Sequence, residues 1–361
     1  MLGHRWRNPS QISGIFGGPG TVPGVPSLRD LERELVADVR DLARDKLPMP
    51  VLFAQLRDRL REVVGFDAGC WHGADPVTGF VTSTVSDGLD LSRFEQAVHI
   101  ELWSDDPLTF ERLRRSGRGA DSVTRATHGR PERSVRYREL LTEMGYGDEM
   151  RLNFDAQGGR WGAAALMRAP DRGPYRAEEL RLVETFTRHV GMALRSCYQP
   201  AGSQPETALA VTVLGPNGQV AAADQQAQAL LAELGEHSGL LTVAEQARGA
   251  GGAPAMARLR APNGRWLMLH ASLLQGGDEG RVAVVARPAA PAEVMPIALM
   301  TYGLTSREQE VARAVLRGNS TKEIAGLLTL TPVTVQDHLR SVFTKTGVRS
   351  RRELIALFMA L

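Results

Sequence analysis

The chain has few of the residues that build covalent or metal-bound sites. Its 361 residues include only two cysteines, Cys70 and Cys197, which lie far apart and form no CxxC spacing. Neither a zinc site nor a disulfide framework is therefore expected, and both thiols are interpreted as buried and unreactive. The eight histidines are scattered along the chain, so no metal and no cofactor is expected.

The sequence also lacks the short motifs of several common enzyme classes. It contains no GxxxxGK[ST] run, no HExxH and no GxSxG, the patterns that bind nucleotide phosphates, hold catalytic zinc or present a nucleophilic serine. We therefore do not expect an enzyme. The alternative is that residues 27–198 turn over a small molecule while the C-terminal tail only tethers it, and the missing acid–base constellation counts against this.

Long apolar runs are missing as well. No stretch is long enough to cross a bilayer, and the first residues, although basic, lead into a polar, Gly-rich segment that lacks the apolar core of a secretory signal. A cytoplasmic location without a membrane partner is expected.

Positive charge is present but unevenly placed. The whole chain has a net charge of +2, whereas residues 301–361 contain nine basic and five acidic side chains, a net charge of +4. The rest of the chain is therefore near −2. A basic module on a nearly neutral body is the electrostatic pattern of a nucleic-acid reader, although +4 is a modest charge.

The same C-terminal residues contain repeated helix-start signals. Three segments read S/T-x-x-E: Thr305–Glu308, Ser320–Glu323 and Ser350–Glu353. In this capping box the hydroxyl and the glutamate each accept a hydrogen bond from a free backbone amide. A fourth start is Thr331 followed by Pro332, while Gly318 and Gly347 end the first and third helices. Four short helices in about sixty residues indicate a helix-turn-helix unit.

Apolar spacing separates the faces of these helices. The residues expected to point inward are Val311, Ala312, Val315, Leu316, Ile324, Ala325, Leu327, Leu328, Val335, Leu339 and Val342. On the third helix, from Pro332 to about Thr346, a second face carries Gln336, Arg340 and Thr344, with Val333 and Asp337 beside them. One polar helix face is therefore left free.

These motifs resemble the LuxR-type (NarL/FixJ) DNA-binding domain. The matching runs are L-T-S-R-E-Q-E-V from Leu304, G-N-S-T-K-E-I-A from Gly318 and T-P-V-T-V-Q-D-H-L from Thr331, followed by Lys345 and Gly347-Val348. The sequence departs from the family at Thr321, usually Asn, at Thr331, usually Ser, and at Gln336, commonly Lys. The last departure, together with the acid Asp337, leaves phosphate affinity and target sequence open. The alternative for such a unit is a structural bundle or a protein-interaction module.

The resemblance implies double-stranded DNA and a second copy of the chain as partners, with RNA polymerase as a further candidate. It places the third helix in the major groove, where Gln336, Asp337 and Arg340 would read bases. It places Lys322, Thr334 and Lys345 on phosphates. Ser320 and Thr331 are expected to contact phosphates as well, because they cap helices whose N-terminal amides and dipole favour an anion. The fourth helix would be the dimer helix, and the residues expected at its contact are Leu354, Leu357, Phe358 and Leu361.

Ahead of this domain, residues 1–26 form a Gly- and Pro-rich leader, and residues 27–198 are expected to form an α+β domain. Apolar residues recur at helical spacing over 28–42, 51–64 and 177–198, and a hairpin signal separates 150–154 from 161–167. This order resembles a GAF domain, as do the runs S-V-R-Y-R-E-L-L from Ser134 and W-G-A-A-A-L from Trp161.

A linker over 199–206 precedes a second α+β domain over 207–288. Strand, tight turn, strand, helix and three further strands resemble a PAS domain, with two x-Pro-Asn-Gly turns closing hairpins. A second linker, 289–300, leads into the all-α four-helix domain over 301–361. The chain is thus predicted to be a bacterial transcriptional regulator. Its front domains would sense a small-molecule ligand or, as the alternative, serve only protein partners and dimerisation.

Overall fold

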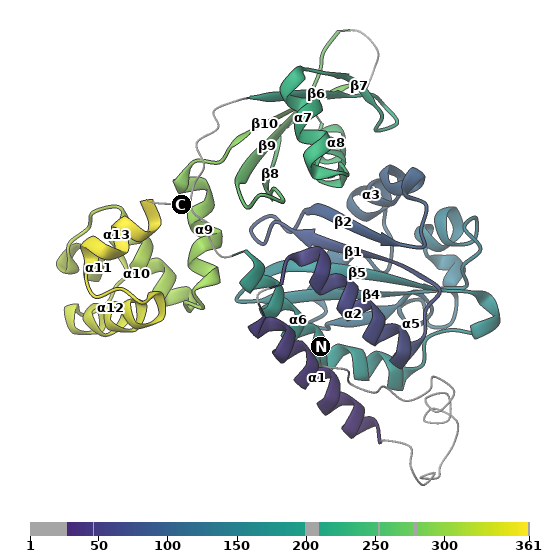
Figure 1. Cartoon of the computed structure of the whole chain (residues 1–361), viewed down its shortest axis with the longest axis horizontal. Coiled ribbons are helices and arrows are strands. Elements are labelled where there is room, and N and C mark those ends of the chain that lie inside the picture. The colour runs from purple at the N-terminus through teal and green to yellow at the C-terminus, as the bar shows by residue number, and fades with distance from the viewer. Residues whose placement is uncertain (1–26, 46, 199–208, 252, 277–279, 360–361) are drawn as a thin grey trace. The chain divides into compact units, whose positions relative to one another are not determined.

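The computed structural model describes residues 27–45, 47–198, 209–251, 253–276 and 280–359 (Figure 1). The leader 1–26 and the linker 199–206 lie outside the described residues. The contacts within the chain define two compact units. The first holds most of residues 27–197, and the second holds residues 74–83, 156–160 and those from 198 onwards. None of the described helices is both long and apolar enough to cross a membrane.

The first unit is an α+β structure around a five-stranded sheet with strand order β2-β1-β5-β4-β3. Its strands are β1 (Ala68–Ala74), β2 (Val81–Asp87), β3 (Ala120–Ser122), β4 (Asp148–Ala156) and β5 (Gly159–Arg168). Its helices are α1 (Leu28–Arg44), α2 (Met49–Val64), α3 (Phe94–Trp103), α4 (Phe110–Arg115), α5 (Val123–Ala126) and α6 (Ala177–Cys197), with short helical turns at Leu91–Arg93, Pro131–Arg133, Tyr137–Leu141 and Pro170–Arg172.

The expected hairpin and helices of this unit are present. Ser27 caps α1, and the apolar stripe of α1 packs along α6 (Figure 1). The turn between β4 and β5 places Gln157 and Gly158 at positive φ, a conformation that glycine adopts without strain. On one face of the sheet, the Trp71 ring lies 5.9 Å from that of Phe53 on α2, centroid to centroid. This face therefore forms the core under the helices.

The two thiols have different environments. Cys70 on β1 is buried, and this burial raises the pKa of its thiol to about 12. That agrees with an unreactive side chain. Cys197, expected to be buried, is only half-buried, and its Sγ lies 3.3 Å from the Leu47 carbonyl oxygen.

A second five-stranded sheet has the equivalent order, β7-β6-β10-β9-β8. Its strands are β6 (Ala210–Leu214), β7 (Val220–Ala223), β8 (Ala255–Arg260), β9 (Trp266–Leu273) and β10 (Val282–Pro288), and its helices are α7 (Gln225–Leu234) and α8 (Ser238–Gly249). Helix α8 is absent from the sequence prediction. Its N-cap, His237, makes no capping hydrogen bond, and Gly239 lies in its first turn, so no local signal marks its start.

The C-terminal domain is all-helical, as predicted. It contains α9 (Pro291–Thr301), α10 (Ser306–Leu316), α11 (Thr321–Leu327), α12 (Pro332–Thr346) and α13 (Arg351–Met359). Helix α9 occupies most of the segment expected to be the linker 289–300. Its Ala298 and Leu299 pack into the same core as α10 and α12, so this segment belongs to the C-terminal core.

Candidate nucleic-acid interface

Helix α12 has sharply defined ends and two unlike faces. The Thr331 hydroxyl accepts a hydrogen bond from the Thr334 amide at 3.1 Å, and Gly347 ends the helix in the left-handed conformation. Val335, Leu339 and Val342 are buried in the domain core, as their spacing predicted. One face of α12 therefore packs against the domain core, and the opposite face is free to contact a partner.

The three predicted base-reading residues all lie exposed on that free side. Arg340 and Asp337 form an ion pair of 3.0 Å between Nη1 and Oδ1, with side chains 78% and 63% exposed. A pair in solvent contributes only about 0–1 kcal/mol, so Arg340 can leave Asp337 at little cost. Arg313 on α10 does not contribute to this pair, because it donates to Gln309 Oε1 at 2.9 Å.

Gln336 is joined to the other helices through Thr321 at the start of α11. Gln336 Nε2 donates to Thr321 Oγ1 at 3.3 Å. Arg351 on α13 donates to the same oxygen at 2.8 Å, and also to the Asn319 carbonyl oxygen at 2.8 Å. One hydroxyl therefore connects α11, α12 and α13 beside the free face.

Most of the predicted phosphate-contacting residues are accessible at helix starts. Ser320 is the N-cap of α11, where its hydroxyl accepts from the Glu323 amide and its own amide donates to the Glu323 carboxylate at 2.6 Å. Thr331 and Lys322 are exposed, and Thr334 is half-buried. The capping hydroxyls satisfy amides within the helices, so other amides of the first turns are the ones available to an anion.

Lys345 is placed differently from the expectation. Its Nζ lies 2.6 Å from Glu308 Oε2, and the two side chains are 34% and 7% exposed. The Glu308 carboxylate also accepts from Ser341 Oγ at 2.6 Å and from the Thr305 amide at 2.7 Å. Lys345 therefore ties α12 to α10 and does not extend towards solvent as a free phosphate contact. The sequence showed Glu308 only as a capping residue.

The predicted dimer residues require a correction. Leu354 and Phe358 are buried in the core of their own domain, where the Phe358 ring meets Tyr302 edge-on at 5.7 Å. Leu357 is half-buried against the same core, and Leu361 lies outside the described residues. The outward side of α13 instead carries Ala356 and Met359, which is 62% exposed.

Two exposed apolar side chains lie near the free face of α12. Val333, in the first turn of α12, is 71% exposed, and Leu327, the last residue of α11, is 62% exposed. Leu327 was expected to point inward, and this prediction is wrong, because the buried face of α11 consists of Ile324 and Ala325 and Leu327 lies beside it on the exposed side.

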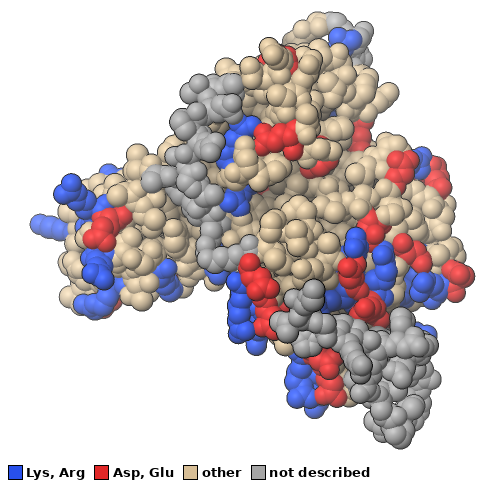
Figure 2. All heavy atoms as spheres, in the orientation of Figure 1, with Lys and Arg blue, Asp and Glu red and all other residues tan. Residues whose placement is uncertain are grey.

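Charge on the C-terminal domain is mixed, with a basic excess. Figure 2 shows Lys and Arg side chains spread over the lobe formed by α10 to α13, with fewer acidic side chains among them. Three of the acidic groups are engaged as capping residues: Glu308, Glu323 and Glu353. These hydrogen bonds leave the carboxylates charged, so the attraction of a polyanion rests on the net charge of +4 over residues 301–361.

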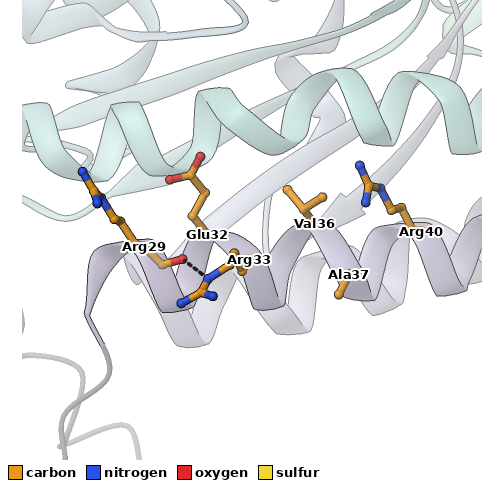
Figure 3. A pocket seen from close by; sticks show the side chains of 6 residues that line it. All are labelled: Arg29, Glu32, Arg33, Val36, Ala37 and Arg40. Carbon is orange, nitrogen blue, oxygen red and sulfur yellow. Dashed lines mark hydrogen bonds between the residues drawn. The ribbon is translucent and has the colours of Figure 1, made fainter.

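The first unit contains a hollow and a set of buried polar groups. The hollow is lined by one face of α1, which carries Arg29, Glu32, Arg33, Val36, Ala37 and Arg40 (Figure 3). All of its described lining comes from this single helix.

The buried polar groups lie on β4. Asn153 is 1% exposed, and its Nδ2 donates to the Phe110 carbonyl oxygen at 2.8 Å, while its Oδ1 has no hydrogen-bond partner in the described part of the chain. Arg151, two residues earlier on the strand, pairs with Glu101 at 2.7 Å and stacks over the Phe110 ring. A buried acceptor without a donor costs about 1–3 kcal/mol, so this oxygen is an unsatisfied group in the interior of the first unit.

Residues 303–358 match the family described as bacterial regulatory proteins, luxR family. No curated protein sequence matches the chain.

Solved structures with similarity to the chain include the phage VqmA–DPO complex, at 19% identity over 44% of this chain and 87% of that chain, with a TM-score of 0.20. The Vibrio cholerae VqmA–ligand–DNA complex is 18% identical over 42% of this chain and 84% of that chain, with a TM-score of 0.24. The VqsR LBD domain from Pseudomonas aeruginosa is 16% identical over 46% of this chain and 94% of that chain, with a TM-score of 0.31.

Proposed function

From the membership of residues 303–358 in the luxR family of bacterial regulatory proteins, we propose that the chain is a sequence-specific transcriptional regulator that reads DNA with α12. The observation that carries the proposal is the division of α12 into a buried apolar face and a free face with Gln336, Asp337 and Arg340. Major-groove recognition needs such a helix, because base edges are read by side chains that the protein core does not use. The proposal contains no enzymatic step, since these residues act by binding.

We propose that the chain binds as a homodimer in the bacterial cytoplasm. Two copies of α12 would enter major grooves one helical turn apart, which requires a half-site spacing of about 34–36 Å. The outward side of α13, with Ala356 and Met359, is the contact we propose between C-terminal domains. RNA polymerase is a candidate partner once the dimer is on DNA.

We further propose that the front domains, which resemble GAF and PAS domains in sequence, control DNA binding. The buried Oδ1 of Asn153 supports a small-molecule signal with a hydrogen-bond donor in the first domain. The alternative is that these domains bind only partner proteins. Native mass spectrometry of protein purified from its host separates the two, because a retained small molecule adds a defined mass to the chain.

The test of base reading is the replacement of Arg340. Arg340→Ala is expected to cost about 1–3 kcal/mol of binding and to relax one position of each half-site, because arginine can bond guanine O6 and N7 together. Gln336→Lys is expected to change base preference more than affinity, moving it from A·T towards guanine. Binding across a randomised half-site library measures both. Arg317→Ala, which removes an equal charge from an exposed residue at the end of α10, is the control.

An unchanged base preference in both α12 variants would contradict the proposal. In that case the free face of α12 does not read the groove, and the C-terminal domain is an interaction module. A loss of affinity equal to that of Arg317→Ala, with no change in preference, would assign Arg340 to nonspecific attraction.

The loss of a phosphate contact is expected to change the salt dependence of DNA binding and to leave the base preference unchanged. Lys322→Ala is expected to weaken binding to all sequences alike and to reduce the slope of log affinity against log salt by about one, because one fewer counterion is released. Lys345→Ala is expected to act mainly on the fold, by leaving Glu308 without its ion-pair partner. Salt titrations and hydrogen exchange of α10 and α12 separate the two effects. A slope change for Lys345→Ala with unchanged exchange would restore it as a phosphate contact.

A further inference from the structure

A side chain on the free face of α12 is oriented by residues of other helices. Gln336 is exposed, and long exposed side chains normally sample several rotamers, which costs entropy when they bind. Here its amide is anchored at 3.3 Å to Thr321 Oγ1, a residue on another helix. Thr321 in turn lies 2.8 Å from an Arg351 nitrogen, and the same guanidinium bonds the Asn319 carbonyl oxygen.

The chemistry of this cluster fixes the direction of each bond. A guanidinium only donates, so the Thr321 oxygen must accept from Arg351 with one of its two lone pairs. The second lone pair is then available to the Gln336 amide NH2, which is the arrangement observed. One amide hydrogen and the carbonyl oxygen of Gln336 are left over. These are the donor and the acceptor that a bidentate contact with adenine N7 and N6 requires.

We propose that Thr321 and Arg351 are positioning residues that set the orientation of the Gln336 amide for base reading. The inference rests on the proposed function, because it takes Gln336 to be a base reader. Arg351 is the residue that makes the arrangement rigid, since its planar fork bonds both the Asn319 carbonyl and the Thr321 hydroxyl, which a lysine cannot do in the same way. The preference encoded on α12 therefore depends on residues in α11 and α13.

The test compares full-length wild-type protein with single variants, and with one double variant, on a randomised double-stranded half-site library. Thr321→Val keeps the shape of the side chain and removes its oxygen, whereas Thr321→Ser keeps the oxygen. Gln336→Ala identifies the base that Gln336 reads. A bidentate contact discriminates by roughly 5- to 150-fold, and losing the orientation of one amide is expected to reduce this preference by about three- to tenfold.

The expected result is that Thr321→Val relaxes the same base position as Gln336→Ala, with little loss of affinity for unrelated sequences, and that Thr321→Ser restores wild-type preference. Arg351→Ala is expected to relax this position as well, and the double variant with Thr321→Val to add little further, because both act through one hydrogen-bonded unit. Arg317→Ala again controls for the lost charge. Unchanged hydrogen exchange of α11 and α12 shows that the variants are folded.

Three results would overturn the inference. One is an unchanged preference in Thr321→Val while Gln336→Ala relaxes a position, which leaves the proposed function intact and removes only the positioning role. Another is a uniform loss of affinity in Thr321→Val, which makes Thr321 a phosphate contact. If Gln336→Ala changes no position at all, base reading by this residue fails first, and the positioning role fails with it.

Discussion

Replacing Glu308 with alanine is expected to destabilise the C-terminal domain by about 1–3 kcal/mol, the range found when a hydrogen-bonded group is removed and its partners are left unsatisfied. The carboxylate accepts hydrogen bonds from Lys345, Ser341 and the Thr305 amide, and therefore joins the cap of α10 to the last turns of α12. Its loss leaves the ammonium group of Lys345, whose side chain is 34% exposed, without this ion-pair partner. Hydrogen exchange of peptides from residues 306–346 measures the effect, because this region contains no tryptophan to report on it.

The Glu308 carboxyl is also expected to make the stability of the C-terminal domain depend on pH in the acid range. Burial alone would raise the pKa of Glu308, but the hydrogen bonds from Lys345, Ser341 and the Thr305 amide outweigh it and lower the pKa to about 2, from an ordinary value of 4.5. A carboxyl with a lowered pKa binds fewer protons in the folded state, so its contribution to stability is complete above about pH 4.5. This contribution is lost as the pH falls from there towards 2.

The matched control is Glu323→Ala. Glu323 occupies the same position in the capping box of α11, but it is exposed and pairs only within its own helix turn. Its removal is expected to loosen α11 without reaching α12, and to leave the acid dependence of α10 and α12 in place. Equal effects of the two substitutions on α12 would show that Glu308 acts only as a cap.

The elements that sequence patterns predicted are those with local causes. The N-caps of α10, α11 and α12 are Thr305, Ser320 and Thr331, as predicted. They could be predicted from the sequence because a capping hydrogen bond spans only three residues. The hairpin at Gln157 and Gly158 is equally local. The free face of α12 was likewise predictable, since a buried stripe at helical spacing determines the opposite side.

What the sequence missed depends on contacts between distant residues. Lys345 and Glu308 are 37 positions apart, so spacing could not reveal that one neutralises the other. Helix α9 lacked a capping side chain at Ala290 and contains Pro296, which made the segment resemble a linker, yet Ala298 and Leu299 are needed to close the C-terminal core. Most other residues of this segment are good helix formers, and Pro291 at the first helical position and Glu293 at the third mark a helix start that the interpretation as a linker overlooked.

Contacts between distant residues also explain why the dimer contact of α13 was predicted on the wrong face of the helix. An apolar run shows that a helix is covered on several sides, but not which side its own domain covers. Leu354 and Phe358, four residues apart, lie on the side that packs against α9 and α10. The exposed apolar surface of α13 is therefore smaller than its apolar sequence suggests, and it centres on Ala356 and Met359.

Because Phe358 is buried and Met359 is exposed, substitutions at these neighbouring residues are expected to have different effects. Phe358→Ala is expected to cost about 3–5 kcal/mol, because it removes a fully buried aromatic ring from the core and leaves a cavity. Met359→Glu places a charge on a side chain that is 62% exposed, so the domain is expected to stay folded. If α13 forms the contact between two copies, the same charge meets its counterpart across the twofold axis and weakens cooperative DNA binding.

Hydrogen exchange, sedimentation and DNA binding of the two variants decide the role of α13. Phe358→Ala is expected to speed exchange throughout α10 and α13 and to lower DNA affinity only as a consequence of unfolding. Met359→Glu is expected to keep wild-type exchange, to reduce binding to a two-half-site DNA and to bind a single half-site normally, because one copy still presents an intact α12. Normal binding of Met359→Glu to two half-sites would place the dimer contact elsewhere in the chain and would leave α13 as a core helix that also holds Arg351 against Thr321.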